Sequence, residues 1–249
     1  MTSSILQQPA DKTTVADRLV DSLRKEILFG HIAIGQRLPS ERDLANTLGV
    51  NRLTLRAALA RLQALGLIVV RHGTGTIVAN WRESAGPETL AFLLRVGDPA
   101  DPTWRTYLEN LLEVRRFVAV EALALASMRR TEQDLEAIRQ SLEVARKNID
   151  DSLRFAHCDF DIARSVVRAA HNIGLELLLN SMAGFPDAQP QVALALYPRP
   201  DVHMAYHDSV IPLIERGDPD VARALIGPAL QAHDRSALER LDALVADSK

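Results

Sequence analysis

Apolar residues recur at helical spacing near the start of the chain. In residues 14–29 they fall four positions apart, at Val15, Leu19, Leu23 and Ile27. This spacing places them on one face of a helix, and Gly30 follows as a residue that favours helix termination. The pattern predicts an amphipathic helix over residues 14–29.

Two further helices are predicted across a short turn. Ser40 precedes Asp43 by three residues, a spacing typical of a capped helix start, and Gly49 closes this short helix. Asn51 is suited to cap the next helix, which ends at Gly66. Its apolar stripe consists of Leu55, Leu59, Leu62 and Leu65.

Two β-branched runs follow, LIVV and TIVA, joined by a turn that contains Gly73 and Gly75. This arrangement predicts a β-hairpin. Three helices followed by a hairpin make a winged helix-turn-helix, which we assign to residues 11–80.

The remainder of the chain is predicted to be helical. Residues 81–87, which include most of the stretch ESAGPE (83–88), are expected to form a linker. Helical periodicity then dominates six segments, namely residues 104–130, 131–147, 150–170, 173–182, 201–216 and 219–245. Because short loops force neighbouring helices to pack antiparallel, residues 88–249 are expected to form an all-α antiparallel bundle of about six or seven helices, making the chain mainly α.

Composition excludes several protein classes. With 249 residues, 47% of them hydrophobic and 24% charged, the chain can bury a hydrophobic core without needing disulfide bonds or structural zinc. A lone cysteine, Cys158, excludes a disulfide framework and a cysteine zinc cage. No apolar run is long enough to span a bilayer, so we expect a cytoplasmic protein with no membrane partner.

Charge is unevenly distributed. Residues 11–81 carry ten Lys and Arg against six Asp and Glu, whereas residues 82–249 carry nineteen against twenty-six. A basic N-terminal domain suits a polyanionic partner, although a difference of this size is also common among solvated surfaces. Charge therefore supports DNA binding only together with the motif.

The predicted recognition helix carries polar residues where base edges would be met. Asn51, Arg52 and Thr54 lie at its start, and Arg56 lies one turn beyond Arg52. Either arginine can donate two hydrogen bonds to guanine, while Arg42 on the preceding helix is better placed for phosphate. These residues predict a surface for double-stranded DNA.

The predicted wing adds a second point of contact. Arg71, His72 and Gly73 lie at its tip, where they can reach an adjacent minor groove. No convergent acid, base and nucleophile are found elsewhere in the chain, since the neighbours of Cys158 would point in different directions on a helix. We therefore expect no enzymatic activity.

The string LPSERDLA, then GVNRLTLR, then LQALGLI and HGTGT, resembles the DNA-binding domain of GntR-family bacterial transcription regulators. The resemblance covers nearly all of residues 12–80. It implies a repressor or activator that binds DNA as a dimer, with Arg42, Arg52, Arg56, His72 and Gly73 at DNA-contact positions. Leu53 stands where a polar residue is frequent in the family.

The helical remainder resembles the effector domain of the FadR subfamily, named after a fatty-acid-responsive regulator. LENLLEVRR and DFDIARSVVRAAHN are among the stretches that carry this resemblance. Many members hold a divalent metal with one Asp and three His, and the metal takes the carboxylate of an acidic effector. Asp159 and His207 match two of these positions, whereas Ala163 and Ala229 stand at the other two.

Two alternatives follow for the effector site. His233 lies one turn beyond Ala229 on the same face, so Asp159, His207 and His233 could together bind zinc or nickel. Otherwise the cavity is mainly apolar and suits an acyl chain or acyl-CoA, anchored by an arginine such as Arg115. Arg115 and Arg116 both lie in a helix expected to line the cavity, although an exposed salt bridge would explain at least one of them.

Together these features predict a ligand-responsive transcription regulator. We expect a homodimer that binds a palindromic operator, with a small organic acid or acyl-CoA as effector in the helical domain. The alternative is a DNA-binding regulator whose helical domain only dimerises.

Overall fold

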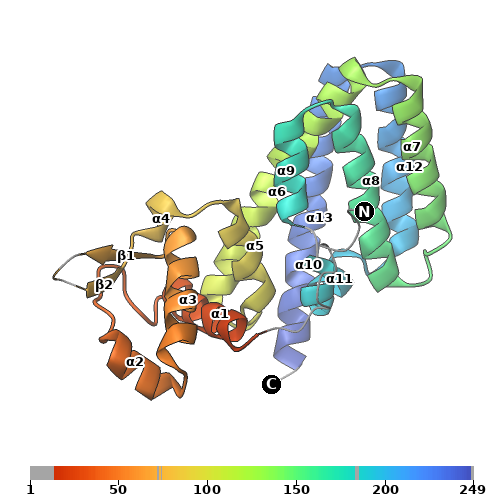
Figure 1. Cartoon of the computed structure of the whole chain (residues 1–249). Helices are drawn as coiled ribbons and strands as arrows, with labels where there is room; N and C mark the ends of the chain where they lie inside the picture. Colours follow the sequence, from red (N-terminus) through yellow and green to blue (C-terminus); the bar gives the residue numbers. More distant parts are fainter. Residues whose placement is uncertain (1–13, 72, 74, 183–184, 248–249) are drawn as a thin grey trace, which may run out of the picture. The chain divides into compact units, whose positions relative to one another are not determined.

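The computed structural model describes residues 14–71, 73, 75–182 and 185–247, and Figure 1 shows the whole chain. The chain divides into two compact units, residues 1–89 and 90–249. Among the described residues, no helix has the length and apolar character that a bilayer crossing requires.

The first unit is the predicted winged helix-turn-helix. Its elements follow the expected order: α1 (Val15–Leu28), α2 (Glu41–Leu48), α3 (Arg52–Ala64), β1 (Ile68–Arg71) and β2 (Gly75–Val78). The two strands pair antiparallel, with Ile68 opposite Val78 and Arg71 opposite Gly75. Arg37 bridges to Ile77, so the loop before α2 lies along the wing.

Local sequence chemistry explains how α2 and α3 begin. The Ser40 side chain accepts a hydrogen bond from the Asp43 amide, and Asn51 accepts one from the Thr54 amide. Gly49 ends α2 in the left-handed conformation, with φ of 64°. That conformation is strained for residues with a Cβ, so the glycine makes the tight turn between the two helices possible.

Most residues of the predicted apolar stripes lie in the core of this unit, but Val15 is 52% exposed and Leu65 is half-buried. Leu55, Leu62 and Leu67 are fully buried, and Ile27 of α1 is 1% exposed. Helix α1 packs on α3 and α2 also packs on α3, so the recognition helix has its inner face fixed and its outer face free.

The expected linker is partly helical. Helix α4 (Trp81–Ser84) directly follows the wing, and α5 (Pro87–Val96) begins three residues later. The Ser84 hydroxyl donates to the carbonyl of Gly66 at 2.6 Å, and a Cβ on Gly66 would lie 2.7 Å from the Ser84 carbonyl oxygen. Gly66 therefore both ends α3 and lets the chain after the wing pack closely against it.

The second unit is helical throughout its described residues. The six predicted segments correspond to α6 (Pro102–Arg129), α7 (Glu132–Arg146), α8 (Ser152–Ala169), α9 (Ile173–Ser181), α12 (Pro200–Arg216) and α13 (Pro219–Asp247). The structure adds two shorter helices, α10 (Phe185–Ala188) and α11 (Pro190–Leu196). The all-α fold class is thus confirmed.

Helices α6 and α13 run antiparallel along one another. Arg105 near the start of α6 pairs with Asp242 near the end of α13, and Arg223 near the start of α13 pairs with Glu121. Helix α8 packs against both α6 and α7, and α12 packs against α6, α7 and α13. This packing brings side chains from α6, α8, α12 and α13 towards the interior of the bundle.

Candidate DNA-binding surface and candidate metal site

The outer face of α3 is open. Arg52, Leu53 and Arg56 are all exposed, whereas Leu55 and Ala58 are fully buried. Residues three and four apart lie on the same side of a helix, so Leu53, Arg56 and Ala57 share the outward face. Thr54 is half-buried, and its amide is held by the Asn51 cap.

Acidic residues of α2 hold the arginines in place. The Arg56 Nε lies 3.1 Å from a Glu41 carboxylate oxygen, and the Arg42 Nε lies 3.4 Å from Asp43. The pKa of Asp43 is lowered, mainly by the Ser40 hydroxyl and then by Arg42 and Arg52. These exposed pairs contribute little to stability, but they orient the guanidinium groups beside the start of α3.

The wing carries two more of the predicted contact residues. Arg71 is exposed at the end of β1, and Gly73 has φ of 77°, a conformation that favours glycine. His72 lies outside the described residues. Arg37 was not singled out from the sequence, yet its guanidinium would be 3.3 Å from a Cβ on Gly75, so it adds positive charge beside the wing.

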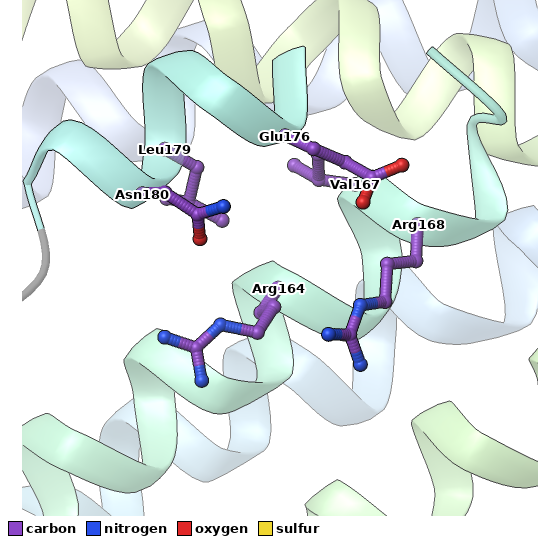
Figure 2. Close-up of a pocket in the computed structure, with 6 residues that line it drawn as sticks. All are labelled: Arg164, Val167, Arg168, Glu176, Leu179 and Asn180. Atoms are coloured by element: carbon purple, nitrogen blue, oxygen red, sulfur yellow. The ribbon is translucent and has the colours of Figure 1, made fainter. Parts of the chain in front are cut away.

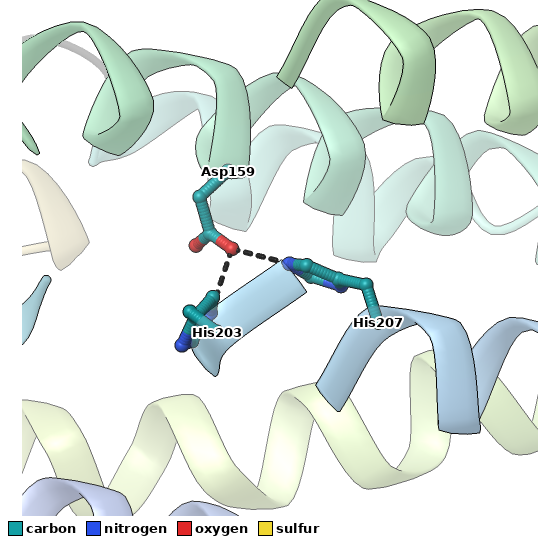
Figure 3. Close-up of side chains that lie close together, drawn as sticks. All are labelled: Asp159, His203 and His207. Atoms are coloured by element: carbon teal, nitrogen blue, oxygen red, sulfur yellow. Dashed lines mark hydrogen bonds and ion pairs between the residues drawn. The ribbon is translucent and has the colours of Figure 1, made fainter. Parts of the chain in front are cut away.

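Inside the helical unit, two histidines converge on one carboxylate (Figure 3). Asp159 comes from α8, and His203 and His207 are one turn apart on α12, facing the same side. The Nε2 atoms of His203 and His207 lie 2.9 and 2.7 Å from the same Asp159 oxygen, Oδ1. Both imidazoles are 8% exposed, so the cluster is buried.

The surroundings keep Asp159 ionised. Burial alone would raise the pKa of its carboxyl, but His203 and then His207 hold that pKa well below its usual range. Both imidazoles therefore donate from Nε2 to a carboxylate, and a metal ion bound here would replace these two protons. The other oxygen of Asp159, Oδ2, accepts a hydrogen bond of 2.5 Å from the Tyr197 hydroxyl, whose pKa burial and Asp159 raise.

His233 on α13 borders this cluster. Its ring centroid lies 4.9 Å from that of His203, and its buried Nε2 has no hydrogen-bond partner. Burial, followed by the charges of His203 and Arg115, lowers its pKa to about 3, so the imidazole is neutral. Ala229, one turn earlier on α13, is exposed, whereas His233 is half-buried.

Of the three ligands predicted from the sequence, the structure groups Asp159 and His207; the third member of the group is His203 and not His233, which borders it. His203 was not predicted from the sequence, because ligands were sought only at and near the positions that hold them in the family. Its signal is the four-residue spacing to His207, which places both imidazoles on one helix face.

Arg115 and Arg116 of α6 meet a buried acid. Both pair with Asp234 of α13, which is 1% exposed, and the Arg116 contact is 2.8 Å long. Burying a carboxylate requires such charge compensation. The Nε of Arg115 is also buried without a hydrogen-bond partner, so this side chain retains one donor.

A small surface pocket lies between α8 and α9 (Figure 2). It is lined by Arg164, Val167, Arg168, Glu176, Leu179 and Asn180. Arg164 is already paired with Asp161 at 2.9 Å. None of the lining residues belongs to the Asp159 cluster, so this pocket is separate from it.

The buried cluster fits a divalent transition metal. One ligand atom from each of Asp159, His203 and His207 lies within 4.8 Å of the others. A carboxylate oxygen and two imidazole nitrogens are a donor set that suits zinc or nickel, and three protein ligands leave a position open for another molecule. The unpartnered Nε2 of His233 beside them is a further available donor.

Comparison with known proteins agrees with both units. Residues 15–78 match the family described as bacterial regulatory proteins, gntR family, and residues 110–243 match the FCD domain. An uncharacterised HTH-type transcriptional regulator of Mycobacterium tuberculosis is 32% identical over 93% of both chains.

Two proteins of Escherichia coli are also similar. One, named as an L-lactate dehydrogenase operon regulatory protein, is 33% identical over 88% of this chain and 83% of its own. The other, a fatty acid metabolism regulator protein, is 33% identical over 60% of each chain.

A solved structure of the Lar regulator of Listeria monocytogenes has the same fold, with a TM-score of 0.57 and 17% identity over 92% of this chain and 99% of its own. The similar proteins with functional names are regulators of transcription, not enzymes. The chain therefore belongs to the GntR family of bacterial transcription regulators, in the FadR subfamily, with an N-terminal DNA-binding domain and a C-terminal FCD effector-binding domain.

Proposed function

We propose that the protein binds a palindromic operator as a homodimer in the cytoplasm. One recognition helix reads only a few base pairs, so two copies related by a two-fold axis match two half-sites one or more helical turns apart. An exposed apolar face on α6 supports self-association, because Val114 is 43% and Phe117 67% exposed one turn apart.

We propose that Arg52 and Arg56 read base edges, with Asn51 and Thr54 at the same end of α3. Arg42, Arg71, His72 and Gly73 would contact the backbone or the adjacent minor groove. The exposure of both recognition-helix arginines supports this, as does the Glu41 carboxylate that orients Arg56.

We further propose that the helical domain binds a small organic acid through a divalent metal. This proposal rests on the convergence of Asp159, His203 and His207, whose ligand atoms lie close enough together to bind one ion. His233 would complete the set or contact the effector directly. A bound zinc or nickel ion with an open position would take a carboxylate oxygen.

Two features support an acidic effector. The Arg115 guanidinium keeps a buried unpaired Nε near the cluster, where a carboxylate can be recognised. The printed names of the two Escherichia coli relatives refer to lactate and fatty acid metabolism, and lactate and fatty acids are both carboxylic acids. An acyl-CoA remains the competing effector class, and a helical domain that only dimerises is the competing function.

We expect the full chain to require two half-sites. Selection from random double-stranded DNA should enrich a palindrome, and binding to one half-site alone should be at least about a hundredfold weaker, since tethering makes the second contact intramolecular. Affinity should fall steeply as salt rises, because phosphate contacts release counterions. Titrations of the palindrome and of the single half-site at several salt concentrations measure both effects. Equal affinity for these two DNAs would contradict binding as a dimer.

A further inference from the structure

One apolar side chain occupies the middle of the DNA-reading surface. Leu53 is 80% exposed, more than any other large hydrophobic side chain in the described part of the chain. Single exposed leucines are ordinary on protein surfaces, so exposure alone carries no meaning. The position of Leu53 is informative, because Leu53 is the second residue of α3 and lies beside Arg52 and one turn before Arg56.

Leu53 has no role in the core of its own unit. The buried residues of α3 are Leu55, Ala58, Leu59 and Leu62, on the opposite side of the helix. Farther along the outward face, Ala57 and Ala60 are exposed and small, so these two positions leave room for a groove close to Leu53 and the arginines. An apolar side chain would thus be carried into contact with base edges.

The major groove offers one strongly apolar group, the C5 methyl of thymine. Arginine, by contrast, reads the O6 and N7 atoms of guanine. We propose that Leu53 packs against a thymine methyl in each half-site, next to a base read by Arg52 or Arg56, and so selects thymine at that position. This inference rests on the proposed role of α3 in reading base edges.

The test removes only the methyl group. In the selected operator, each thymine is replaced in turn by deoxyuridine, which keeps every hydrogen-bonding atom. For the unaltered protein, one replacement per half-site removes two methyl contacts from the dimer and should weaken binding roughly fifteenfold, since burial of each methyl group contributes a factor of about four. For Leu53→Ala, the same replacement should have no effect, and binding to the thymine operator should already be weakened.

Two controls separate this contact from other losses. Leu177→Ala truncates a 63% exposed leucine of α9. It should leave the affinities for the thymine operator and for the deoxyuridine operator unchanged, and so also the ratio between them. Arg52→Ala should weaken binding but preserve this ratio. Because Leu53 is so exposed, Leu53→Ala should unfold at the same temperature as the parent.

The outcomes are distinguishable. A protein that enriches no operator at all would overturn the role of α3 and this inference with it. An operator that is bound tightly, but in which no thymine is sensitive or the sensitivity persists in Leu53→Ala, would overturn the Leu53 contact alone.

Discussion

Replacing Arg52 or Arg56 with alanine is expected to weaken specific operator binding strongly while the protein stays folded. Each bidentate contact to guanine contributes about 1 to 3 kcal/mol of discrimination. A dimer carries each arginine twice, so one substitution removes roughly 2 to 6 kcal/mol, or about thirtyfold to more than ten-thousandfold in affinity. Both side chains are exposed, so thermal unfolding should be unchanged.

The control for lost positive charge is Arg168→Ala, an exposed arginine on α8 in the other unit. It should leave operator affinity unchanged at fixed salt. The decisive comparison is between the operator and unrelated DNA. If Arg52→Ala and Arg56→Ala weakened both DNAs equally, the arginines would contact phosphate rather than bases.

Loss of the Asp159 carboxylate is expected to remove bound metal. Purified protein should hold about one zinc or nickel ion per subunit. Asp159→Asn should weaken metal affinity by at least about a hundredfold, since even mutation of residues that only hydrogen-bond to metal ligands lowers metal affinity about ten- to a hundredfold. His203→Ala and His207→Ala should do the same. His233→Ala should weaken binding less if that imidazole contacts the effector rather than the ion.

Asp161→Asn provides the matched control, because Asp161 lies on the same helix but is exposed and pairs with Arg164. Metal content by elemental analysis and metal titration of the stripped protein give the readout. The parent, the control and Asp159→Asn should all remain folded when stripped. Parent protein that neither retains nor takes up zinc or nickel would contradict the metal site.

Much of the DNA-binding unit could be predicted from the sequence, because its signals are local. The Ser40 and Asn51 caps, the Gly49 turn and the leucine stripe of α3 each depend on residues a few positions apart. The wing followed from two β-branched runs around a glycine turn. Helices α4 and α5 were missed, because ESAGPE has the composition of a linker although it includes the end of α4 and the start of α5.

The interior of the helical unit could be predicted only in part. Asp159 and His207 came from a family pattern, but the inclusion of His203 depends on which face α12 turns towards α8. The pairing of Arg115 and Arg116 with Asp234 depends on the register between α6 and α13, because each arginine is more than a hundred residues from Asp234 in sequence. Such long-range register has no local signal.

The helical domain is proposed to sense a ligand and to change the affinity of the protein for DNA. Coupling between two sites typically amounts to about 1 to 3 kcal/mol, or about 5- to 150-fold in affinity. The most direct measurement is therefore the operator dissociation constant of the full chain at one salt concentration. This dissociation constant is measured for metal-free and for zinc-loaded protein. Each form is tested alone, with short hydroxy acids or dicarboxylic acids, and with acyl-CoA.

We predict a change of at least about fivefold with zinc and one of the short acids, absent in Asp159→Asn and retained in Asp161→Asn. A response to acyl-CoA that is independent of zinc and of Asp159 would contradict the metal-dependent effector. If the protein binds zinc and an acid but its operator affinity is the same in every condition, the helical domain serves dimerisation alone and the account of a ligand-responsive regulator is wrong.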